Sequence, residues 1–500
     1  MKWYSLPLVT AASLAAGVAL AADLPKKKAP VAPPPPPAWL DTLTVDGYVE
    51  GGIAINFNQP YNKLNWGHLY TDRANWPTFN GAVLTVQRPI DPKATTYDFG
   101  FKLQGQIGED ARYNHLTGFL DYLIHDRTQI AILEANVQAH LPWTSIISEG
   151  GVDVKAGIMP TYNGAELMYA KDNLFYSHSY IFNFGPFLHT GLMTTTHVRE
   201  WLDVYAGVTT GVNNWIGYPG QPNASPSFHG GFGLNLLEGN LTVLGIVHHG
   251  PQNSSQGRFN YLYTPAALTA SAWPNGVLGG IPQACICEPN TANRTFANLT
   301  TTWKATENLT LITDIAYNRE SGWNPISTVT GIPQNQYGAF DGIAAGINPA
   351  WPGLAALPQK PQGAESYAIA QYASYKINDI FKINGRIEYY RDNKNFFVTG
   401  FPGYFDSVNS FHGFPCPSCI FQPANVGTSY LALTIGTTIT PEIPKLPIIT
   451  GLILRPEFRW DTSVNGTQPF FRGQNSGNWV ARSSSQGMFN MDVIIPFSLL

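Results

Sequence analysis

Hydrophobic and polar residues alternate with a period of two along most of this chain. In the first long example, odd positions from Leu43 to Phe57 are apolar or glycine, and most even positions between them are polar. Successive side chains of a β-strand point to opposite faces, so this pattern predicts a strand with one apolar and one mostly polar face. The segment is also longer than a usual globular strand of about 5–6 residues.

The same alternation recurs through to the C-terminus. In one segment Ala131, Leu133 and Val137 are expected on the apolar face and Glu134 on the polar face. The full set predicts about 16 strands, each with its connection taking about 30 residues, which is typical of a single-chain outer-membrane barrel. Further segments lie near 81–88, 99–107, 152–158, 188–196, 203–209, 228–236, 241–248, 295–304, 309–318, 366–377, 381–390, 428–439, 452–461 and 489–497.

Charges on the polar faces favour a membrane barrel over a soluble sheet. Arg386 and Glu388 alternate with Ile387 and Tyr389, and such charges are costly in a packed core but tolerated in a wet lumen. Lipid requires every backbone group to be paired within the protein, which strands achieve by closing into a ring. The predicted fold is therefore all-β, a closed antiparallel transmembrane β-barrel with long extracellular loops over residues 41–500. The alternative is a soluble antiparallel sheet whose charged face is in contact with water.

The N-terminus predicts export. Residues 1–21 have the form of a cleaved signal peptide, with a basic start, an apolar stretch from Leu6 to Leu20 and a small-residue site at Ala19–Ala21. Residues 22–40, rich in Lys and Pro, are predicted to be an extended periplasmic linker. The expected location is the outer membrane of a Gram-negative cell.

Composition excludes several classes of protein. Charged residues are 12% of the chain, about half of the roughly 25% usual in soluble domains, which argues against charge-rich disorder. The net charge of -4 argues against a nucleic-acid partner. After residue 22 no apolar run reaches the ~18 residues that a membrane helix needs. The long connections 250–292, 321–362 and 391–427 are predicted to be extracellular loops.

Four cysteines form two close pairs, Cys285 with Cys287 and Cys416 with Cys419, among Pro and Gly residues. An exported chain meets oxidising conditions, so disulfides in surface loops are the first expectation. A zinc tetrathiolate and a redox motif are the alternatives.

Residues 150–191 are the most distinctive part of the chain. A Gly151-Val-Asp-Val-Lys-Ala-Gly strand is followed by Asn173-Leu-Phe-Tyr-Ser-His-Ser and by Pro186-Phe-Leu-His-Thr-Gly191. This block resembles the OmpL-like β-barrel porin family of outer-membrane proteins. The resemblance implies a channel for small hydrophilic solutes, with no established catalytic set.

The predicted function is a passive diffusion pore, because a barrel of 16–18 strands leaves an aqueous channel. Loop 161–187 is expected to fold inward and narrow it. Charged inner-face residues are then expected to set the field felt by ions and solutes. The predicted pore-lining residues are Lys102, Lys155, Lys382, Arg386, Arg455 and Arg459 as cations and Asp46, Glu50, Glu134, Asp153, Glu388 and Glu457 as anions.

No catalytic residue, cofactor or metal site is predicted, and the chain is not expected to be an enzyme. His248 and His249 are adjacent, so on a strand they point to opposite faces and are poor joint ligands. Expected partners are outer-membrane lipid and lipopolysaccharide, the barrel insertion machinery and small solutes, and an oligomer is compatible with the sequence. Two alternatives stay open: an exported soluble carbohydrate-binding or hydrolytic β-protein, and a non-conducting structural or adhesive barrel.

Overall fold

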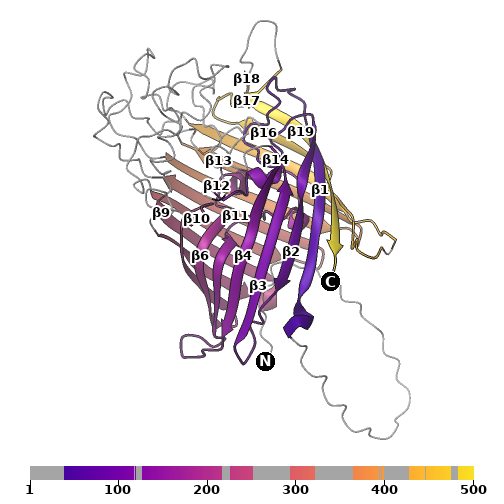
Figure 1. Ribbon diagram of the computed structural model, residues 1–500. Coiled ribbons are helices and arrows are strands. Elements are labelled where there is room, and N and C mark those ends of the chain that lie inside the picture. The colour runs from indigo at the N-terminus through magenta and orange to yellow at the C-terminus, as the bar shows by residue number, and fades with distance from the viewer. Residues whose placement is uncertain are drawn as a thin grey trace, which may run out of the picture.

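The computed structural model describes residues 39–116, 119, 127–216, 226–251, 293–320, 364–393, 395, 397–398, 427–444, 446–473 and 482–500. Their main feature is one antiparallel sheet closed into a barrel (Figure 1). The sheet closes because β1 (Thr44–Asn56) pairs with β2 (Pro77–Arg88) on one side and with β19 (Ser485–Ser498) on the other. The predicted closed barrel is therefore confirmed, and two stacked sheets are excluded.

The strands follow one another around the ring in chain order. The remaining strands are β3 Asp98–Gly108, β4 Gln129–Leu141, β5 Val152–Pro160, β6 Leu188–Arg199, β7 Leu202–Thr209, β8 Ser227–Leu236, β9 Leu241–Pro251, β10 Asn293–Lys304, β11 Leu309–Glu320, β12 Ala364–Lys376, β13 Phe381–Asp392, β14 Thr428–Ile439, β15 Ile453–Leu454 and β16 Glu457–Ser463. Pro456 separates β15 from β16, since proline lacks the N–H of a ladder bond, and the two count as one crossing. Within the described residues the barrel thus has 16 strands.

Helices are few and short. They are η1 Trp39–Thr42, η2 Asp110–Arg112, η3 Ala170–Asp172, α1 Tyr180–Asn183 and η5 Leu237–Gly239. A small hairpin of β17 (Phe470–Phe471) and β18 (Arg482–Ser483) lies outside the main sheet. Across the described residues, no helix combines the length and apolar character needed to span a bilayer.

Side-chain exposure along the strands is the reverse of that in a soluble protein. On β13, Ile383 and Ile387 are exposed whereas Arg386 and Glu388 are buried. β19 repeats this, with Val493 exposed and its neighbours buried. Apolar side chains that face outward have a favourable environment only in lipid. The alternation therefore places the polar face inside the barrel, as the sequence predicts.

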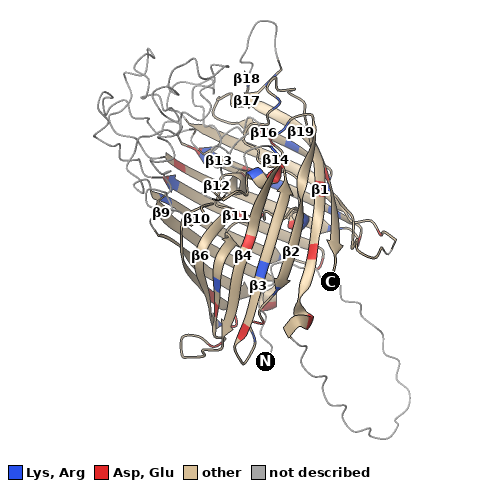
Figure 2. Cartoon of the chain, viewed as in Figure 1, with Lys and Arg blue, Asp and Glu red and all other residues tan. Residues whose placement is uncertain are grey.

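Exposed aromatic residues lie in two belts, one near each end of the strands. Such belts mark the two membrane interfaces of outer-membrane barrels. One belt contains Tyr97, Phe99, Trp143, Trp201, Trp303, Tyr375 and Phe381, and the other contains Phe57, Trp76, Phe79, Phe228, Tyr317, Tyr367, Phe458 and Phe489. Figure 2 shows that Lys, Arg, Asp and Glu also occur along the strands and not only at their ends.

Strand β4 departs from the predicted alternation. A register shift between β3 and β4 pairs Gln104 with Glu134 but Gly105 with Ile132, leaving Leu133 as an extra residue. This β-bulge reverses the order of faces, so Ala131 and Leu133 are buried inside rather than exposed. The prediction that both lie on the lipid face with Val137 was wrong, and the bulge explains why the start of this segment lacks a clean pattern.

The connections differ greatly in length between the two ends of the barrel. At one end β6 and β7 are joined through residues 200–201 and β8 and β9 through 237–240, whereas at the other β5 and β6 are joined through 161–187. In outer-membrane barrels the long loops are extracellular and the short turns periplasmic. We call these the long-loop end and the short-turn end. The four cysteines, residues 1–38 and most of loops 250–292, 321–362 and 391–427 lie outside the described residues.

Candidate functional site

Loop 161–187 leaves the wall after β5 and crosses the barrel interior before it rejoins the wall at β6. On one side the Tyr169 hydroxyl donates to Glu134 Oε1 of β4 at 2.5 Å. Across the barrel, Tyr180 N donates to Glu388 Oε2 of β13 at 2.7 Å. Strands β4 and β13 are separated by eight others along one arc of the ring, so the loop bridges nearly opposite walls, in the position that the sequence predicts.

The loop is shaped by its own residues before it meets the wall. Gly164 has a φ of +87°, a left-handed conformation that glycine adopts without a Cβ penalty. The single turn of α1 begins at Ser179, whose hydroxyl accepts from Phe182 N at 3.1 Å and so caps the turn. The Asn173 side chain bonds Leu167 at both N–H and carbonyl, at 2.8 and 2.6 Å. These hydrogen bonds fix the conformation of the loop backbone where it contacts the barrel wall.

Glu166 is the centre of the loop's contacts. Its carboxylate pairs with Arg386 Nη1 at 2.6 Å and accepts from the Tyr372 hydroxyl at 2.9 Å. It also accepts from Ser179 N at 3.0 Å and meets His178 Nδ1 at 2.9 Å. Burial raises the pKa of this carboxyl, but the adjacent Arg386 charge and these bonds outweigh burial and lower the pKa to about 2. Glu166 is therefore ionised at neutral pH.

Three arginines of the wall bind the loop's carbonyl groups. Arg386 Nη1 donates to Ser177 O at 2.9 Å and Arg459 Nη1 to His178 O at 2.7 Å. Arg455 Nη1 donates to Ala170 O at 2.7 Å and Asn173 O at 2.9 Å. A guanidinium carries several donors in a rigid fork, so one side chain holds the loop and still faces a carboxylate.

Carboxylates of the wall compensate the arginine charges and bind loop amides. Arg459 Nη2 lies 2.8 Å from Asp461 Oδ1 and 3.0 Å from Glu388 Oε1, and Arg455 Nε donates to Asp492 Oδ1 at 3.0 Å. Glu457 accepts from two successive loop amides, Tyr176 N at 2.9 Å and Ser177 N at 3.1 Å. Buried charge is tolerated when it is paired and hydrogen-bonded, and here the loop backbone supplies part of that pairing.

A second loop packs against the first. In loop 57–76, His68 Nε2 lies 3.1 Å from Asp461 Oδ2, and Trp66 Nε1 donates to the Tyr430 hydroxyl at 3.1 Å. Asn183 Nδ2 donates to Gly67 O at 3.1 Å, which joins the two loops directly. Aromatic residues from both loops and the wall form a buried cluster here, so the interior is tightly packed at this level.

All twelve predicted pore-lining residues occupy inner-face positions. Seven of them are buried in the contact zone of loop 161–187: Glu50, Glu134, Arg386, Glu388, Arg455, Glu457 and Arg459. Lys102 is paired with Glu134 at 2.6 Å. Asp46, Asp153, Lys155 and Lys382 lie toward the short-turn end and are less buried. That these residues line a water-filled path stays a prediction.

The sequence analysis missed Glu166 and Asp492. Asp492 lies between Met491 and Val493 in the last alternating segment. The alternation of side chains along that strand is therefore enough to place it on the inner face of the barrel. Glu166 has no such signal, because its role depends on the path of the loop. Ser177 and His178 add to the contacts around Glu166 and Arg386. The Ser177 hydroxyl accepts from Arg386 Nη2 at 3.3 Å, and His178 bonds Glu166.

The family assignment comes from residues 42–497, which match the model of a protein family described as "Putative beta-barrel porin-2, OmpL-like". The chain belongs to this family. The predicted resemblance is thereby confirmed over nearly the whole barrel, and this OmpL-like chain is an outer-membrane porin. A search of the curated proteins found no match.

Several solved structures are similar to this OmpL-like porin over most of the chain. The DcaP channel of Acinetobacter baumannii is 11% identical, with 91% of this chain and 97% of that chain covered and a TM-score of 0.46. An anion-selective porin from Comamonas acidovorans is 9% identical, with 91% and 99% covered and a TM-score of 0.48. OprD of Pseudomonas aeruginosa is 11% identical, with 93% and 97% covered and a TM-score of 0.40.

One group of side chains in this porin has the composition of a metal site. His189, His229 and His248 come from β6, β8 and β9, and their nearest ligand atoms all lie within 4.8 Å of one another. The sequence analysis predicted no metal ligands. Its geometric point about adjacent histidines agrees with the structure, since His248 is buried and His249 exposed. What it missed is that strand pairing places His229 directly opposite His248.

Proposed function

We propose that the barrel is a passive diffusion channel for small hydrophilic solutes or ions, and that loop 161–187 sets its narrowest point. The observation that carries the proposal is the attachment of this loop to nearly opposite walls, through Glu134 and Tyr169 on one side and Glu388 and Tyr180 on the other. A loop held at both sides by buried bonds is a fixed constriction, because releasing it would leave several buried charges without partners.

The inner-face charges toward the short-turn end give the channel its electrical character. Lys102 and Asp153 keep 20% and 19% of their side-chain surface exposed, and Lys155 is half-buried. A low-dielectric wall focuses the field of such charges on solutes inside the barrel. Among the twelve predicted residues, those that keep exposed surface are accordingly our first candidates for selectivity, and the chain acts without catalysis or a cofactor.

We also propose how the chain reaches its membrane. Residues 1–21 are a cleaved signal peptide, residues 22–40 a periplasmic linker, and the barrel insertion machinery places residues 41–500 in the outer membrane. The outward apolar faces then contact lipid and lipopolysaccharide, and an oligomer is compatible with this arrangement. Mass spectrometry of the mature protein tests cleavage: an N-terminus at Ala22 is expected, and an intact Met1 contradicts it.

Conductance in planar bilayers tests the channel. Detergent-folded protein is expected to give discrete current steps, and Arg386→Met is expected to enlarge and destabilise them because Glu166 and Ser177 lose their shared partner. Arg319→Gln is the matched control, since Arg319 lies near the long-loop end of β11 with 62% of its side chain exposed.

Heat-modifiable gel mobility confirms that each sample is folded before recording. Folded wild-type protein that gives no current steps would contradict the channel and favour the non-conducting structural barrel. Equal steps from wild type and Arg386→Met would leave the channel in place but remove loop 161–187 as its constriction.

A further inference from the structure

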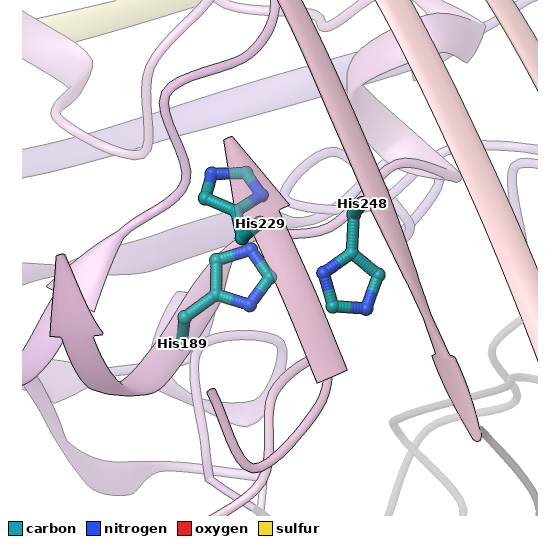
Figure 3. Close-up of side chains that lie close together, drawn as sticks. All are labelled: His189, His229 and His248. Atoms are coloured by element: carbon teal, nitrogen blue, oxygen red, sulfur yellow. The ribbon is translucent and has the colours of Figure 1, made fainter. Parts of the chain in front are cut away.

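Three histidines meet inside the barrel near its long-loop end (Figure 3). His189 lies in β6, one residue after that strand begins, His229 lies in β8 and His248 in β9. Their ring centroids are 4.2 Å apart for His189 and His229, 4.9 Å for His189 and His248, and 5.8 Å for His229 and His248. All three side chains are buried, at 0–1% exposure.

Several of their ring nitrogens lack hydrogen-bond partners among the described residues. His189 Nδ1 bonds the carbonyl of Gly211 at 3.0 Å, so Nδ1 carries the proton and the unpartnered Nε2 presents a lone pair. Neither nitrogen of His248 has a partner, and Nδ1 of His229 has none. Buried polar atoms are normally hydrogen-bonded, and leaving them unpaired is costly. Each of the three rings therefore has at least one unpartnered nitrogen among the described residues, which indicates a missing common ligand.

We infer that His189, His229 and His248 form a binding site for one late first-row divalent cation, of which Zn²⁺ and Cu²⁺ are the best matches. Neutral imidazole suits these metals, whereas Ca²⁺ and Mg²⁺ prefer oxygen ligands. The bond from His189 Nδ1 to the Gly211 carbonyl is the kind of outer contact that fixes the tautomer of a metal-bound histidine. Three histidines leave a fourth position for water or a solute group.

The rings must close on the ion for all three to bind it. Two nitrogens on one tetrahedral Zn²⁺ lie about 3.3 Å apart, given a Zn–N bond of about 2.0–2.1 Å, so nitrogens that lie within 4.8 Å of one another approach by at most roughly 1.5 Å when the ion binds. Ligation by His229 Nδ1 moves its proton to Nε2 and gives up the contact of 3.4 Å from Tyr162 N. That contact is long for a hydrogen bond, so its loss costs little.

The charged residues near the three histidines do not disfavour the binding of a cation. Arg294 of β10 pairs in register with Gly250, close to His248 along the neighbouring strand. Its guanidinium is compensated, because Arg294 Nε donates to Glu320 Oε2 at 2.7 Å. The cluster itself contains no charged side chain, so an entering divalent ion meets three neutral donors.

The position of the site connects it to the constriction. Tyr162, at the start of loop 161–187, contacts the His229 ring at 6.1 Å between centroids, and His189 follows the end of the same loop by two residues. A bound metal would therefore clamp the end of the loop, at His189, to β8 and β9. Metal binding does not depend on the proposed channel function, whereas an effect of metal on conductance rests on it.

Metal binding to the full folded chain tests the inference. Protein stripped with chelator is titrated with Zn²⁺ alone, added either before or after folding in detergent, and bound metal is measured after gel filtration. Wild type is expected to retain about one Zn²⁺ per chain, and His248→Gln and His229→Gln to bind at least roughly tenfold more weakly, since losing a ligand costs no less than losing an outer-shell partner. Cu²⁺ is expected to show nitrogen couplings in its electron paramagnetic resonance spectrum.

His249→Gln is the matched control. This neighbour lies on the same strand, faces outward and bonds Thr295 Oγ1 at 2.8 Å, so its loss is expected to leave Zn²⁺ binding unchanged. Heat-modifiable mobility shows that each variant is folded, and His189→Gln provides a second test if one variant fails to fold. No retained Zn²⁺ in folded wild type under either protocol, or equal weakening by His248→Gln and His249→Gln, overturns the site. Metal binding without any change in conductance overturns only the clamp.

Discussion

The two halves of the barrel interior carry the same types of charged residue in very different states. Toward the long-loop end, Arg459 and Asp461 are completely buried and bind the crossing loop or each other. Toward the short-turn end, Asp153 remains partly exposed and Lys382 is exposed. The strand pattern is identical in the two halves. The difference arises because loop 161–187 lies mainly in the half toward the long-loop end, where the charged side chains hold the loop. We expect the charges toward the short-turn end to stay available to solutes.

The largest expected effect comes from removing a charge beneath the loop. Arg459→Met deletes a cation that faces Glu388 and Asp461 and donates to His178 O. Breaking a buried pair by removing one partner costs about 3–5 kcal/mol, because the other charge is left buried and uncompensated. The free energy of unfolding is expected to fall by that amount in denaturant titrations followed by tryptophan fluorescence.

Lys382→Met is the control for that prediction. Lys382 is an exposed inner-face residue of β13 at the short-turn end, where substitutions usually change stability by less than about 0.5 kcal/mol. Equal losses from both variants would mean that the two halves do not differ in the way described above.

The next effect is the pH dependence of stability that Glu166 causes. We expect it to be slightly smaller than the loss of stability in Arg459→Met. The pKa of Glu166 is about 2 in the folded protein against an ordinary value of 4.5, so the folded state binds the proton less readily. The associated stability is fully present above pH 4.5 and is lost as the pH falls toward 2. A difference of roughly 2.5 pKa units corresponds to about 3 kcal/mol.

Subtracting the Glu166→Gln curve from the wild-type curve isolates this contribution. The difference in unfolding free energy is expected to be constant from pH 7 to 5 and to shrink between pH 4.5 and 2. A difference that stays constant down to pH 2 would show that the carboxyl is not held by Arg386 as the geometry indicates.

A smaller effect is expected where the loop touches a glycine. A Cβ on Gly52 of β1 would lie 2.5 Å from Cζ of Tyr176, a buried side chain whose hydroxyl bonds Asn80 at 2.9 Å. Overpacking of this kind costs about 1–3 kcal/mol, so Gly52→Ala is expected to lower the unfolding free energy by that amount.

Gly385→Ala tests whether the cost belongs to the loop. A Cβ on Gly385 of β13 meets nothing within 4 Å, so this variant is expected to be neutral or slightly stabilising, as alanine lowers the entropy of the unfolded chain. If Gly52→Ala is as harmless as Gly385→Ala, then Tyr176 does not press against β1 in the folded protein.

Much of the barrel could be predicted from the sequence because its rule is local. Parity along a strand decides which residues face lipid, so Arg386 and Ile387 are assigned correctly without knowledge of any neighbour. The rule fails at β4, because a β-bulge inserts one residue and reverses the faces of Ala131 and Leu133. A bulge is set by pairing with the adjacent strand, which the alternation of one strand does not record.

The sites could be predicted only in part, because they depend on contacts between distant segments. The sequence analysis expects loop 161–187 to fold inward, but the choice of Glu166 as partner for Arg386 depends on the route of the loop backbone. The histidine cluster needs the register that places His229 opposite His248. Neither fact is encoded in the spacing of the residues along the sequence.

The smallest effect on stability, and the most informative about function, is expected at Lys155. This half-buried residue of β5 lies with its Nζ 5.6 Å from the centre of the Tyr162 ring, on the inner face next to the start of the loop. Removing a partly exposed charge changes stability by less than about 0.5 kcal/mol but removes positive potential from the interior. Lys155→Gln is therefore expected to shift the reversal potential in a salt gradient toward cation preference.

Arg319→Gln removes the same charge from a position whose side chain is 62% exposed and is expected to leave the reversal potential unchanged. If both variants shift it equally, surface charge at the barrel mouth sets ion preference. If neither does, permeating ions do not pass near Lys155. A shift from Lys155→Gln alone would show that permeating ions pass the inner face of β5 next to the start of loop 161–187.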